Sequence, residues 1–538
     1  MTFRNKFAED IFKLKYARFE GQTWEQKARE IVEDVTRGIM DDDEVELCYS
    51  YIRDMKFIPG GRYIYYAGRE MKAYNNCYLL KTEEDTREEW GKIYKEASDC
   101  LMSGGGIGVD YSTLRPKGAK LQRTGGTASG PIPLMVGVNE VGRQVMQGGS
   151  RRSAIYASLN WKHGDVMDFL RIKDWPDYVQ KQKMVDFNTP APLDMTNISV
   201  NYDTEWLETY KSTGTYGDVF LENVKQALKT SEPGFSFNFY DKENETLRNA
   251  CTEVTSEDNA DVCNLASLNL AAISHKDEFN KVVEIATKFL VCGTIRATLP
   301  FDKVYETREK NRRLGLGLMG VHEWLIKKNY PYEVVDELRL WLQTYQDVSN
   351  VTAKCFTNKL GLSNPVAVRA VAPAGSIGIL AGTTTGIEPL FAVAYKRRYL
   401  KGTEWHYQYV VDSAAQDMIQ RYGVDPNSIE SAMDLAADPE RRIRFQADIQ
   451  DFVDMSISST INLPAYEEQE FTDEEFASLL AKYAERLRGF TCYADGSRGG
   501  QPLTAVPYHE AANQVGQEFL EVETNDICDI RGGGSCGV

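Results

Sequence analysis

Three residues near the middle of the chain have the types and spacing of a reaction centre. Asn249, Cys251 and Glu253 alternate along the sequence, and a strand or an extended loop would point all three side chains the same way. An amide, a thiol and a carboxylate on one edge can recognise, oxidise and protonate a substrate. A second thiol follows at Cys263, ahead of an apolar run. We therefore expect the catalytic site within residues 248–270.

Composition limits the classes of protein to which the chain can belong. Its 538 residues, 11% aromatic and 26% charged, suit a large α/β barrel with added segments and argue against wholesale disorder. A net charge of −17 argues against a general nucleic-acid binder, which needs a basic face. The charged amino terminus is unlike a signal peptide, and no apolar run has the length of a membrane span. We expect a cytoplasmic protein that binds neither nucleic acid nor membrane and keeps most of its ten cysteines reduced.

The apolar pattern predicts the elements that would position these residues. Residues 4–60 have helical spacing, and another amphipathic helix is expected over residues 85–102. Between residues 155 and 300, short apolar runs alternate with helical stretches, which is typical of repeated βα units. Residues 311–328 and 336–361 are predicted to be long helices. A further helix is predicted to follow a capping box at Thr472 and to end at Gly489.

Glycine-rich segments would let a phosphate or a sugar come close to the backbone. The cluster at 103–108 lacks the third glycine of a dinucleotide fingerprint and follows a helix, so it is interpreted as a helix end with close packing, compatible with a substrate-approach loop. Loops 114–118 and 147–153 combine glycine with arginine, which favours an anion partner in so acidic a chain. A glycine–serine turn after Pro373 opens a predicted helix, and its N–H groups suit a phosphate.

Several familiar kinds of site are not supported by the sequence. The five histidines are scattered, and no cysteine pair has zinc-finger spacing, so no metal site is predicted. The chain also lacks a G-x-S-x-G elbow and a GK[ST] phosphate loop. The patterns that remain indicate cysteine chemistry, together with glycine- and arginine-containing loops that could bind the phosphates of a nucleotide.

The order of the motifs resembles the catalytic subunit of ribonucleotide reductase. NNC, SGGGIG, QGGSRR, NACTE, CNLASLNL, APAGSIG, GIEP and GSRGGQPL follow one another, and the resemblance runs from about residue 15 to the tail. It implies reduction of ribonucleotides, expected as diphosphates, by thiyl-radical chemistry. It also implies a ten-stranded α/β barrel of two parallel half-barrels, with a finger loop that carries Cys251 into the centre. The expected domains are a helical region (1–74), the catalytic barrel (75–508) and a flexible tail (509–538).

Roles for the central residues follow from the resemblance, position by position. Cys251 would be the thiyl-radical cysteine that takes the ribose 3′ hydrogen. Glu253 would be the base for the 3′ hydroxyl, and Asn249 would hydrogen-bond the sugar hydroxyls. Cys77 and Cys263 would be the pair that reduces the substrate and ends as a disulfide. These residue types suit the chemistry, because loss of the 2′ hydroxyl as water needs a proton donor and two thiols supply two electrons.

The binding loops and the tail are assigned in the same way. The substrate-binding positions would be Asn76, Gly105, Gly106, Pro373, Ala374, Gly375, Ser376 and Ile377. Ala374 stands where a threonine is expected, so contacts there would come from backbone N–H groups. A dNTP effector, at the interface of a homodimer, would contact Asp85, Arg115, Gly149, Ser150, Arg151 and Arg152. Cys528 and Cys536 would pass electrons from a thioredoxin- or glutaredoxin-type reductant, although their spacing is wider than that of the family's usual pair.

The start of the chain bears on regulation. The sequence begins directly with the helical segment and lacks the family's regulatory ATP cone. The resemblance therefore predicts specificity control by a deoxynucleotide and no overall inhibition by dATP. Inhibition by dATP at a second, non-specificity site would contradict this.

Two sources of the radical stay open. Forms with a separate metal-carrying subunit normally have two adjacent tyrosines late in the barrel, whereas segment 491–498 has only Tyr493. This favours adenosylcobalamin as the cofactor. The alternative is a radical from a ferritin-like dimetal small subunit, with Cys492 and Tyr493 as a reduced relay, because so short a chain leaves less protein to hold a large cofactor.

Hypotheses from other classes are weaker. Residues 486–490 fit the loose pattern of a glycyl-radical enzyme, but the glycyl-radical reductases lack the glutamate found at Glu253. A protein dithiol–disulfide oxidoreductase acting through the tail would need a C-x-x-C motif, which the chain lacks. A nucleotide-binding regulator that has lost catalysis would show damage at Cys251 or Glu253, and both are intact.

Overall fold

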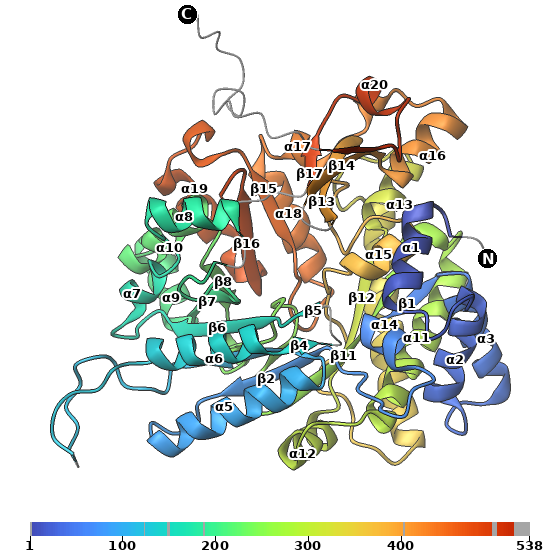
Figure 1. Ribbon diagram of the computed structural model, residues 1–538. Coiled ribbons are helices and arrows are strands. Elements are labelled where there is room, and N and C mark those ends of the chain that lie inside the picture. Colours follow the sequence, from blue (N-terminus) through green and yellow to red (C-terminus); the bar gives the residue numbers. More distant parts are fainter. Residues whose placement is uncertain are drawn as a thin grey trace, which may run out of the picture.

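Five parallel strands form the first half of a barrel. The computed structural model describes residues 3–122, 124–147, 151–186, 189–401, 404–497 and 503–520. In it, neighbouring strands pair in sequence order: β2 (Cys77–Lys81), β3 (Gly106–Asp110), β6 (Ile155–Asn160), β7 (Thr196–Tyr202) and β8 (Gly234–Phe237) (Figure 1). These strands are buried along nearly their whole length, as parallel strands covered by helices are expected to be.

The second half of the barrel repeats the arrangement with five more parallel segments. They are β11 (Asp261–Asn269), β12 (Leu314–Met319), segment 367–372, segment 455–459 continuing into β15 (Thr460–Leu463), and β16 (Gly489–Ala494). Segment 367–372 joins β12 through the parallel bridge Leu316–Arg369 and joins segment 455–459 through the parallel bridge Val371–Ile457. These bridges complete the second half.

Two antiparallel junctions close the ring. β11 pairs antiparallel with β2, and β16 pairs antiparallel with β8. The ten segments therefore form one barrel made of two parallel half-barrels that run in opposite directions. This confirms the predicted fold.

Helices cover the outside of the barrel. The amino-terminal helices α1 (Lys6–Lys15), α2 (Trp24–Thr36), α3 (Asp42–Arg53) and α4 (Gly61–Tyr66) lie with β1 (Phe57–Pro59), which pairs antiparallel with β11. They lie on the same side as α11 (Lys276–Arg296) and α14 (Asp336–Lys359) (Figure 1). The remaining α-helices of the described residues are α5 (Arg87–Met102), α6 (Ile132–Gln144), α7 (Val166–Leu170), α8 (Asp177–Val185), α9 (Thr204–Thr213), α10 (Asp218–Thr230), α12 (Asp302–Asn311), α13 (Val321–Lys327), α15 (Gly375–Ala381), α16 (Ser413–Tyr422), α17 (Ala432–Leu435), α18 (Pro439–Gln450), α19 (Asp473–Tyr483) and α20 (Tyr508–Ala511).

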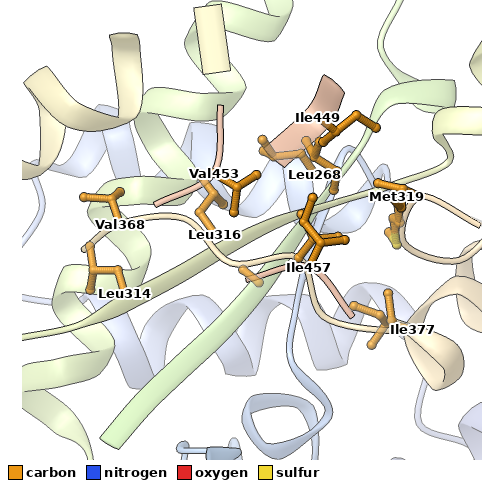
Figure 2. Packing of buried hydrophobic residues seen from close by; sticks show 14 of the residues in the cluster. Leu268, Leu314, Leu316, Met319, Val368, Ile377, Ile449, Val453 and Ile457 are labelled. Atoms are coloured by element: carbon orange, nitrogen blue, oxygen red, sulfur yellow. The ribbon is translucent and has the colours of Figure 1, made fainter. Parts of the chain in front are cut away.

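The strands of the second half-barrel pack outward against helices. Figure 2 shows Leu268 of β11 and Leu316 of β12 beside Ile457 and beside Ile449 of α18, all of them buried. Burial of large aliphatic side chains in this layer is the main force that holds strands and helices together.

A small antiparallel sheet lies beside the barrel. Its strands run in the order β17 (Leu503–Ala505), β13 (Ala394–Lys401), β14 (Glu404–Val411) and β18 (Glu518–Leu520) (Figure 1). Within the described ranges, none of the helices is both long enough and apolar enough to cross a membrane.

Two of the predicted helices are partly wrong. Residues 311–328 contain the fully buried strand β12 before the short helix α13 begins, because an apolar run with alternating glycines also suits a strand covered on both faces. The helix that follows Thr472 has the predicted capping box but ends at Tyr483, and Gly489 opens β16 instead of ending that helix.

Candidate active site

A hairpin inside the barrel carries the central residues. Its strands β9 (Leu247–Arg248) and β10 (Thr255–Ser256) pair antiparallel, and the loop 249–254 connects them. Glycines of β3 make room for this hairpin. A Cβ on Gly108 would collide with the carbonyl oxygen of Arg248, and a Cβ on Gly106 would lie 3.2 Å from that of Ala250. The glycine cluster therefore ends a helix, as predicted, and also lets the finger hairpin lie against the barrel wall.

Contacts from both half-barrels hold the tip of the hairpin. Asn197 of β7 donates its side-chain N–H to the carbonyl of Ala250 at 3.0 Å. The backbone N–H of Ser456 donates to the carbonyl of Glu253 at 2.8 Å. The two carbonyls flank Cys251 in sequence, so the loop that presents this thiol is tied to opposite halves of the barrel.

The conformation of the loop differs from the extended one that the alternation predicts. Thr252 donates its backbone N–H to the carbonyl of Asn249 at 3.0 Å and has a positive φ of 70°. The segment is thus a turn. Asn249 and Glu253 are buried, with 2% and 1% of their surface exposed, while Cys251 is exposed. The three side chains do not lie in one row, because the turn breaks the period of two on which that prediction depends.

The side chains of Asn249 and Glu253 instead converge on Cys77. Asn249 Nδ2 donates to Cys77 Sγ at 3.0 Å, and Cys77 Sγ lies 3.9 Å from Glu253 Oε1. Cys77 stands directly opposite Cys263 in the antiparallel register of β2 and β11. The structure thus brings together four of the five predicted catalytic residues at one junction of the half-barrels, and the fifth, Cys251, is close enough to influence the pKa of Cys77.

Burial sets the protonation states of these groups. It raises the pKa of Glu253 to about 7, against the hydrogen bonds that this carboxyl accepts. Its other oxygen, Oε2, is buried without a hydrogen-bond partner. Burial likewise raises the pKa of Cys77 and of Cys263 well above the usual range. At neutral pH both thiols therefore carry their protons, and Glu253 is poised between its two forms.

An apolar shell surrounds the cysteine pair. It consists of Leu79, Leu247, Val254, Leu265, Ala367, Ala370, Ala372 and Met455. A tightly packed apolar interior of this kind limits the access of water and oxidants to Cys77 and Cys263.

The predicted substrate-binding positions lie in two places. Asn76 precedes β2, and its Oδ1 is buried without a hydrogen-bond partner, while Gly105 and Gly106 lead into β3. The turn 373–377 follows barrel segment 367–372 and opens α15. In this turn Ala374 has a left-handed φ of 54°, Gly375 and Ser376 are exposed, and Ile377 packs into the core (Figure 2).

The predicted effector residues are only partly described. Asp85 and Arg115 form an ion pair between the loop before α5 and the loop after β3. Arg151 and Arg152 form β5, which pairs antiparallel with β4 (Met146–Gln147). Gly149 and Ser150 lie outside the described residues, as do the tail cysteines Cys528 and Cys536.

The two predicted relay residues face different ways. Cys492 is buried, and its Sγ lies 3.6 Å from the carbonyl of Ala227 on the outer helix α10. Tyr493 is the next residue of β16, so its side chain points to the other face of the strand. The structure does not bring the two side chains together on one face.

The sequence pattern does not reveal a pocket beside the finger loop. The pocket has a volume of about 610 Å³. Asn197, which bonds the carbonyl of Ala250, lies in its wall. The other lining residues are Lys173, Trp175, Gln180, Lys183, Asp194, Lys229, Thr230, Glu232, Ala465, Tyr466, Glu467, Ala494, Asp495, Gly496 and Ser497. These residues come from separated segments that no sequence motif links. Some of them follow β15 and β16 directly, and this position at the ends of barrel strands is the one signal that could have indicated a site.

Known proteins resemble the chain in sequence and in fold. Residues 75–191, 206–355 and 342–493 match the model of the ribonucleotide reductase barrel domain. A vitamin B12-dependent ribonucleoside-diphosphate reductase of Mycobacterium tuberculosis is 27% identical over 532 residues, covering 87% of this chain and 74% of that protein. One of Thermoplasma acidophilum is 26% identical over 507 residues, covering 84% and 65%.

A solved structure shows the same fold. The class Id ribonucleotide reductase alpha subunit of Actinobacillus ureae superposes with a TM-score of 0.72 at 17% identity, covering 91% of this chain and 97% of that one. The matched barrel domain spans more than half of the sequence and contains the finger hairpin and both cysteines of the facing pair. The chain therefore belongs to the ribonucleotide reductase family, as a catalytic large subunit.

Proposed function

We propose that this chain reduces ribonucleotides to 2′-deoxyribonucleotides by thiyl-radical chemistry at Cys251. The observation that carries the proposal is the convergence of Asn249 and Glu253 on Cys77, opposite Cys263, beneath a loop that exposes Cys251. An amide, a carboxyl near neutrality and two protonated thiols are the groups that removal of a ribose hydroxyl requires.

Each residue has its own part in the reaction. The Cys251 thiyl radical takes the hydrogen atom from C3′ of the ribose, and ionised Glu253 accepts the proton of the 3′ hydroxyl. A thiol of the Cys77–Cys263 pair protonates the 2′ hydroxyl, which leaves as water. The other thiol of the pair gives its hydrogen to C2′, and the pair becomes a disulfide as it supplies two electrons in all. Glu253 returns its proton to the 3′ oxygen, and Cys251 returns its hydrogen atom to C3′.

The protonation states support these roles. A pKa of about 7 lets Glu253 accept a proton near neutral pH. Because the pKa values of Cys77 and Cys263 are raised, both thiols stay protonated and hold the proton that must be delivered to the leaving hydroxyl. The backbone N–H of Val254 donates to Asn249 Oδ1 at 3.0 Å, and this bond fixes the orientation of the Asn249 amide in the site.

Adenosylcobalamin is the radical source that we propose. Relatives with 26–27% identity are named vitamin B12-dependent reductases, and segment 491–497 has a single tyrosine. The pocket beside the finger loop offers Trp175 and Tyr466 for a nucleoside ring and Thr230 and Ser497 for its hydroxyls. A corrin is larger than this pocket, so only part of the cofactor would be enclosed. When bound, the cofactor supplies an organic radical through its cobalt–carbon bond.

Substrate and effector classes complete the proposal. We propose a ribonucleoside diphosphate as substrate, since the M. tuberculosis relative is named a diphosphate reductase, with its phosphates on the backbone of turn 373–377. A dNTP effector would displace or join the half-buried Asp85–Arg115 ion pair, at the interface of a homodimer. Cys528 and Cys536 would connect the site to a thioredoxin- or glutaredoxin-type reductant.

One experiment separates the possible outcomes. The pure chain is incubated with a ribonucleoside diphosphate, dithiothreitol and a dNTP. One reaction contains adenosylcobalamin, a second contains a ferritin-like dimetal subunit and a third contains neither, and deoxynucleotide is measured in each. Product that requires adenosylcobalamin supports both the reaction and the cofactor. Product that instead requires a ferritin-like dimetal subunit establishes the alternative radical source. Absence of product under both conditions contradicts the proposed function, and a parallel reaction with the triphosphate decides the substrate class.

A further inference from the structure

The two cysteines of the facing pair have different neighbours. Cys77 and Cys263 are opposite each other in register, and both are almost fully buried. Cys77 contacts the amide of Asn249 and the carboxyl of Glu253, both from the finger loop. Cys263 belongs to β11, and its Sγ lies 3.4 Å from the carbonyl of Asn264. A disulfide between them would therefore join two sulfurs in unequal surroundings.

A buried cation stands on the Cys263 side. Arg313 is 4% exposed and forms an ion pair with fully buried Asp261 at 2.9 Å. Its guanidinium also donates to Ser256 at 3.3 Å, at the root of the finger hairpin. Arg313 lowers the pKa of the Cys263 thiol, whereas burial raises it most and Asp261 and Glu253 raise it further. Arg313 is thus a buried cation whose charge favours a thiolate on Cys263.

The Cys77 thiol has different electrostatic surroundings. After burial, which raises its pKa most, the largest effects on the pKa of Cys77 come from Glu253, Cys263, Cys251 and Asn249. None of these four is a cation, and only the N–H of Asn249 favours a thiolate there. The two sulfurs thus differ in that Cys263 has a cation among its neighbours, whereas Cys77 has the amide of Asn249 and the carboxyl of Glu253.

Packing also differs between the two sulfurs. β12, the strand beside β11, packs closely on Cys263, since a Cβ added to Gly315 would lie only 3.0 Å from Cys263 Sγ. Cys77 instead faces the loop whose tip exposes Cys251. Of the two sulfurs, Cys77 is the one hydrogen-bonded to the finger loop.

From this asymmetry we propose that reduction of the active-site disulfide has one direction: the incoming thiolate bonds to Cys77, and Cys263 leaves. The proposal rests on the proposed function, which forms the disulfide. The attacking sulfur forms a bond to Cys77 Sγ as the Cys77–Cys263 bond breaks, and the electron pair passes to Cys263 as a thiolate beside Arg313.

The second half of the exchange completes the electron balance. A second thiolate of the same dithiol reductant attacks the sulfur bound to Cys77, forms the reductant's disulfide, and releases Cys77 as a thiolate. Both released thiolates take up protons, that of Cys77 next to Glu253 at 3.9 Å. The reductant is oxidised by two electrons, and the cysteine pair is reduced by two. Exchange is faster when the leaving thiolate is stabilised, and Arg313 supplies that stabilisation to Cys263 in the first step.

A trapping experiment tests the direction. The full chain with Cys528→Ser and Cys536→Ser, which keeps the tail out of the exchange, performs one turnover without reductant. Peptide mass spectrometry first checks for the Cys77–Cys263 disulfide. A short pulse of glutathione is then quenched with acid and N-ethylmaleimide, and the two cysteine peptides are analysed. We expect glutathione on Cys77 and maleimide on Cys263, in roughly tenfold excess over the reverse pattern.

The outcomes separate this inference from the proposed function. Absence of the disulfide after turnover contradicts the proposed function, and the inference falls with it. Presence of the disulfide with glutathione mainly on Cys263, or equally on both sulfurs, overturns the inference alone.

Paired variants test the part played by Arg313. The double variant Arg313→Gln/Asp261→Asn removes both charges together, since removing one would leave a buried charge unpaired. We expect it to lose most of the preference for Cys77, and we expect Arg313→Lys, which keeps the cation, to retain it. Circular dichroism establishes that each variant is folded. An unchanged preference in a folded double variant overturns the assignment to Arg313.

Discussion

At the scale of single residues, Glu253 connects the chemistry of the site to the stability of the fold. Its carboxyl is 1% exposed, has one oxygen without a hydrogen-bond partner, and titrates near neutrality because of burial. A base for a ribose hydroxyl needs such a pKa, since a carboxyl that ionises at its usual pKa would be a weaker base. The fold therefore holds a charge at this position that it would be more stable without.

The pH dependence of stability should show this cost. The pKa of Glu253 is raised from 4.5 to about 7 in the folded chain. Below pH 4.5 the carboxyl is protonated in both the folded and the unfolded chain, so burying it carries no charge penalty. Folding stability then falls as the pH rises, and the full penalty is reached once the pH has passed through 7. The shift corresponds to on the order of 3 kcal/mol. Between pH 5 and 8 the melting temperature of wild type should fall relative to that of Glu253→Gln, and parallel curves for the two proteins would contradict the assigned pKa.

Residue types and motif order predict the members of the site but not its geometry. The sequence pattern identifies Asn249, Cys251 and Glu253 as a group, and the family resemblance adds Cys77 and Cys263. Spacing alone predicts a row of side chains, whereas the positive φ of Thr252 makes a turn that directs two of them onto Cys77. A turn of this kind depends on contacts with distant strands, such as the Ser456 N–H on the carbonyl of Glu253, which no local pattern contains.

At the scale of elements, the finger hairpin depends on glycines in the strand beside it. Gly108 of β3 lies against the carbonyl of Arg248, and Gly106 lies against Ala250. The glycine cluster was predicted to be a site of close backbone packing, and the structure identifies the finger hairpin as its partner. β12, in contrast, is an element whose type could not be predicted from its sequence. Its apolar run fits a helix or a strand equally well, and only pairing with β11 and segment 367–372 decides for the strand.

Substitution of a single β3 glycine should disturb the hairpin. Gly108→Ala places a methyl group on the Arg248 carbonyl and should cost about 3 kcal/mol or more in unfolding free energy, with loss of activity. Gly91→Ala is the matched control. Gly91 lies on the exposed face of α5 with nothing within 4 Å of an added Cβ, so it should gain about 0.5–1 kcal/mol. Urea unfolding of both variants measures this, and equal stabilities would show that the hairpin does not press on β3.

At the scale of the whole molecule, the site lies where two half-barrels meet. The pairing of β2 with β11 brings Cys77 and Cys263 together from opposite halves, and the tip of the finger hairpin is bonded to both halves. The site therefore exists only when the ring is closed. Segment 367–372 is joined to its neighbours by two isolated bridges and by backbone hydrogen bonds, such as those from Leu316 to Val368 and from Met455 to Arg369.

Arg369 reinforces this part of the ring and offers a test of it. Its buried guanidinium donates to the carbonyl of Phe452 at 2.7 Å, to Ser349 at 2.8 Å and to Asn350 at 2.6 Å, and it pairs with Asp454. Arg369→Met leaves these acceptors unpaired and should lower the unfolding free energy by about 3–5 kcal/mol.

Arg421→Met on α16 provides the control for that change. The Arg421 side chain is 71% exposed, and its loss should change stability by less than about 0.5 kcal/mol. Chemical denaturation compares the two variants. A similar, small effect for both would show that the ring does not depend on Arg369.

The most direct test of the account asks whether Cys251 is the sulfur that takes the ribose hydrogen. Wild type, Cys251→Ser and the control Cys355→Ser, whose exposed thiol lies on α14, are incubated with ribonucleotide, reductant, effector and radical source. Deoxynucleotide is then measured. Wild type and Cys355→Ser should form product at equal rates, while folded Cys251→Ser should form none. Product at the full rate from Cys251→Ser would contradict the central claim.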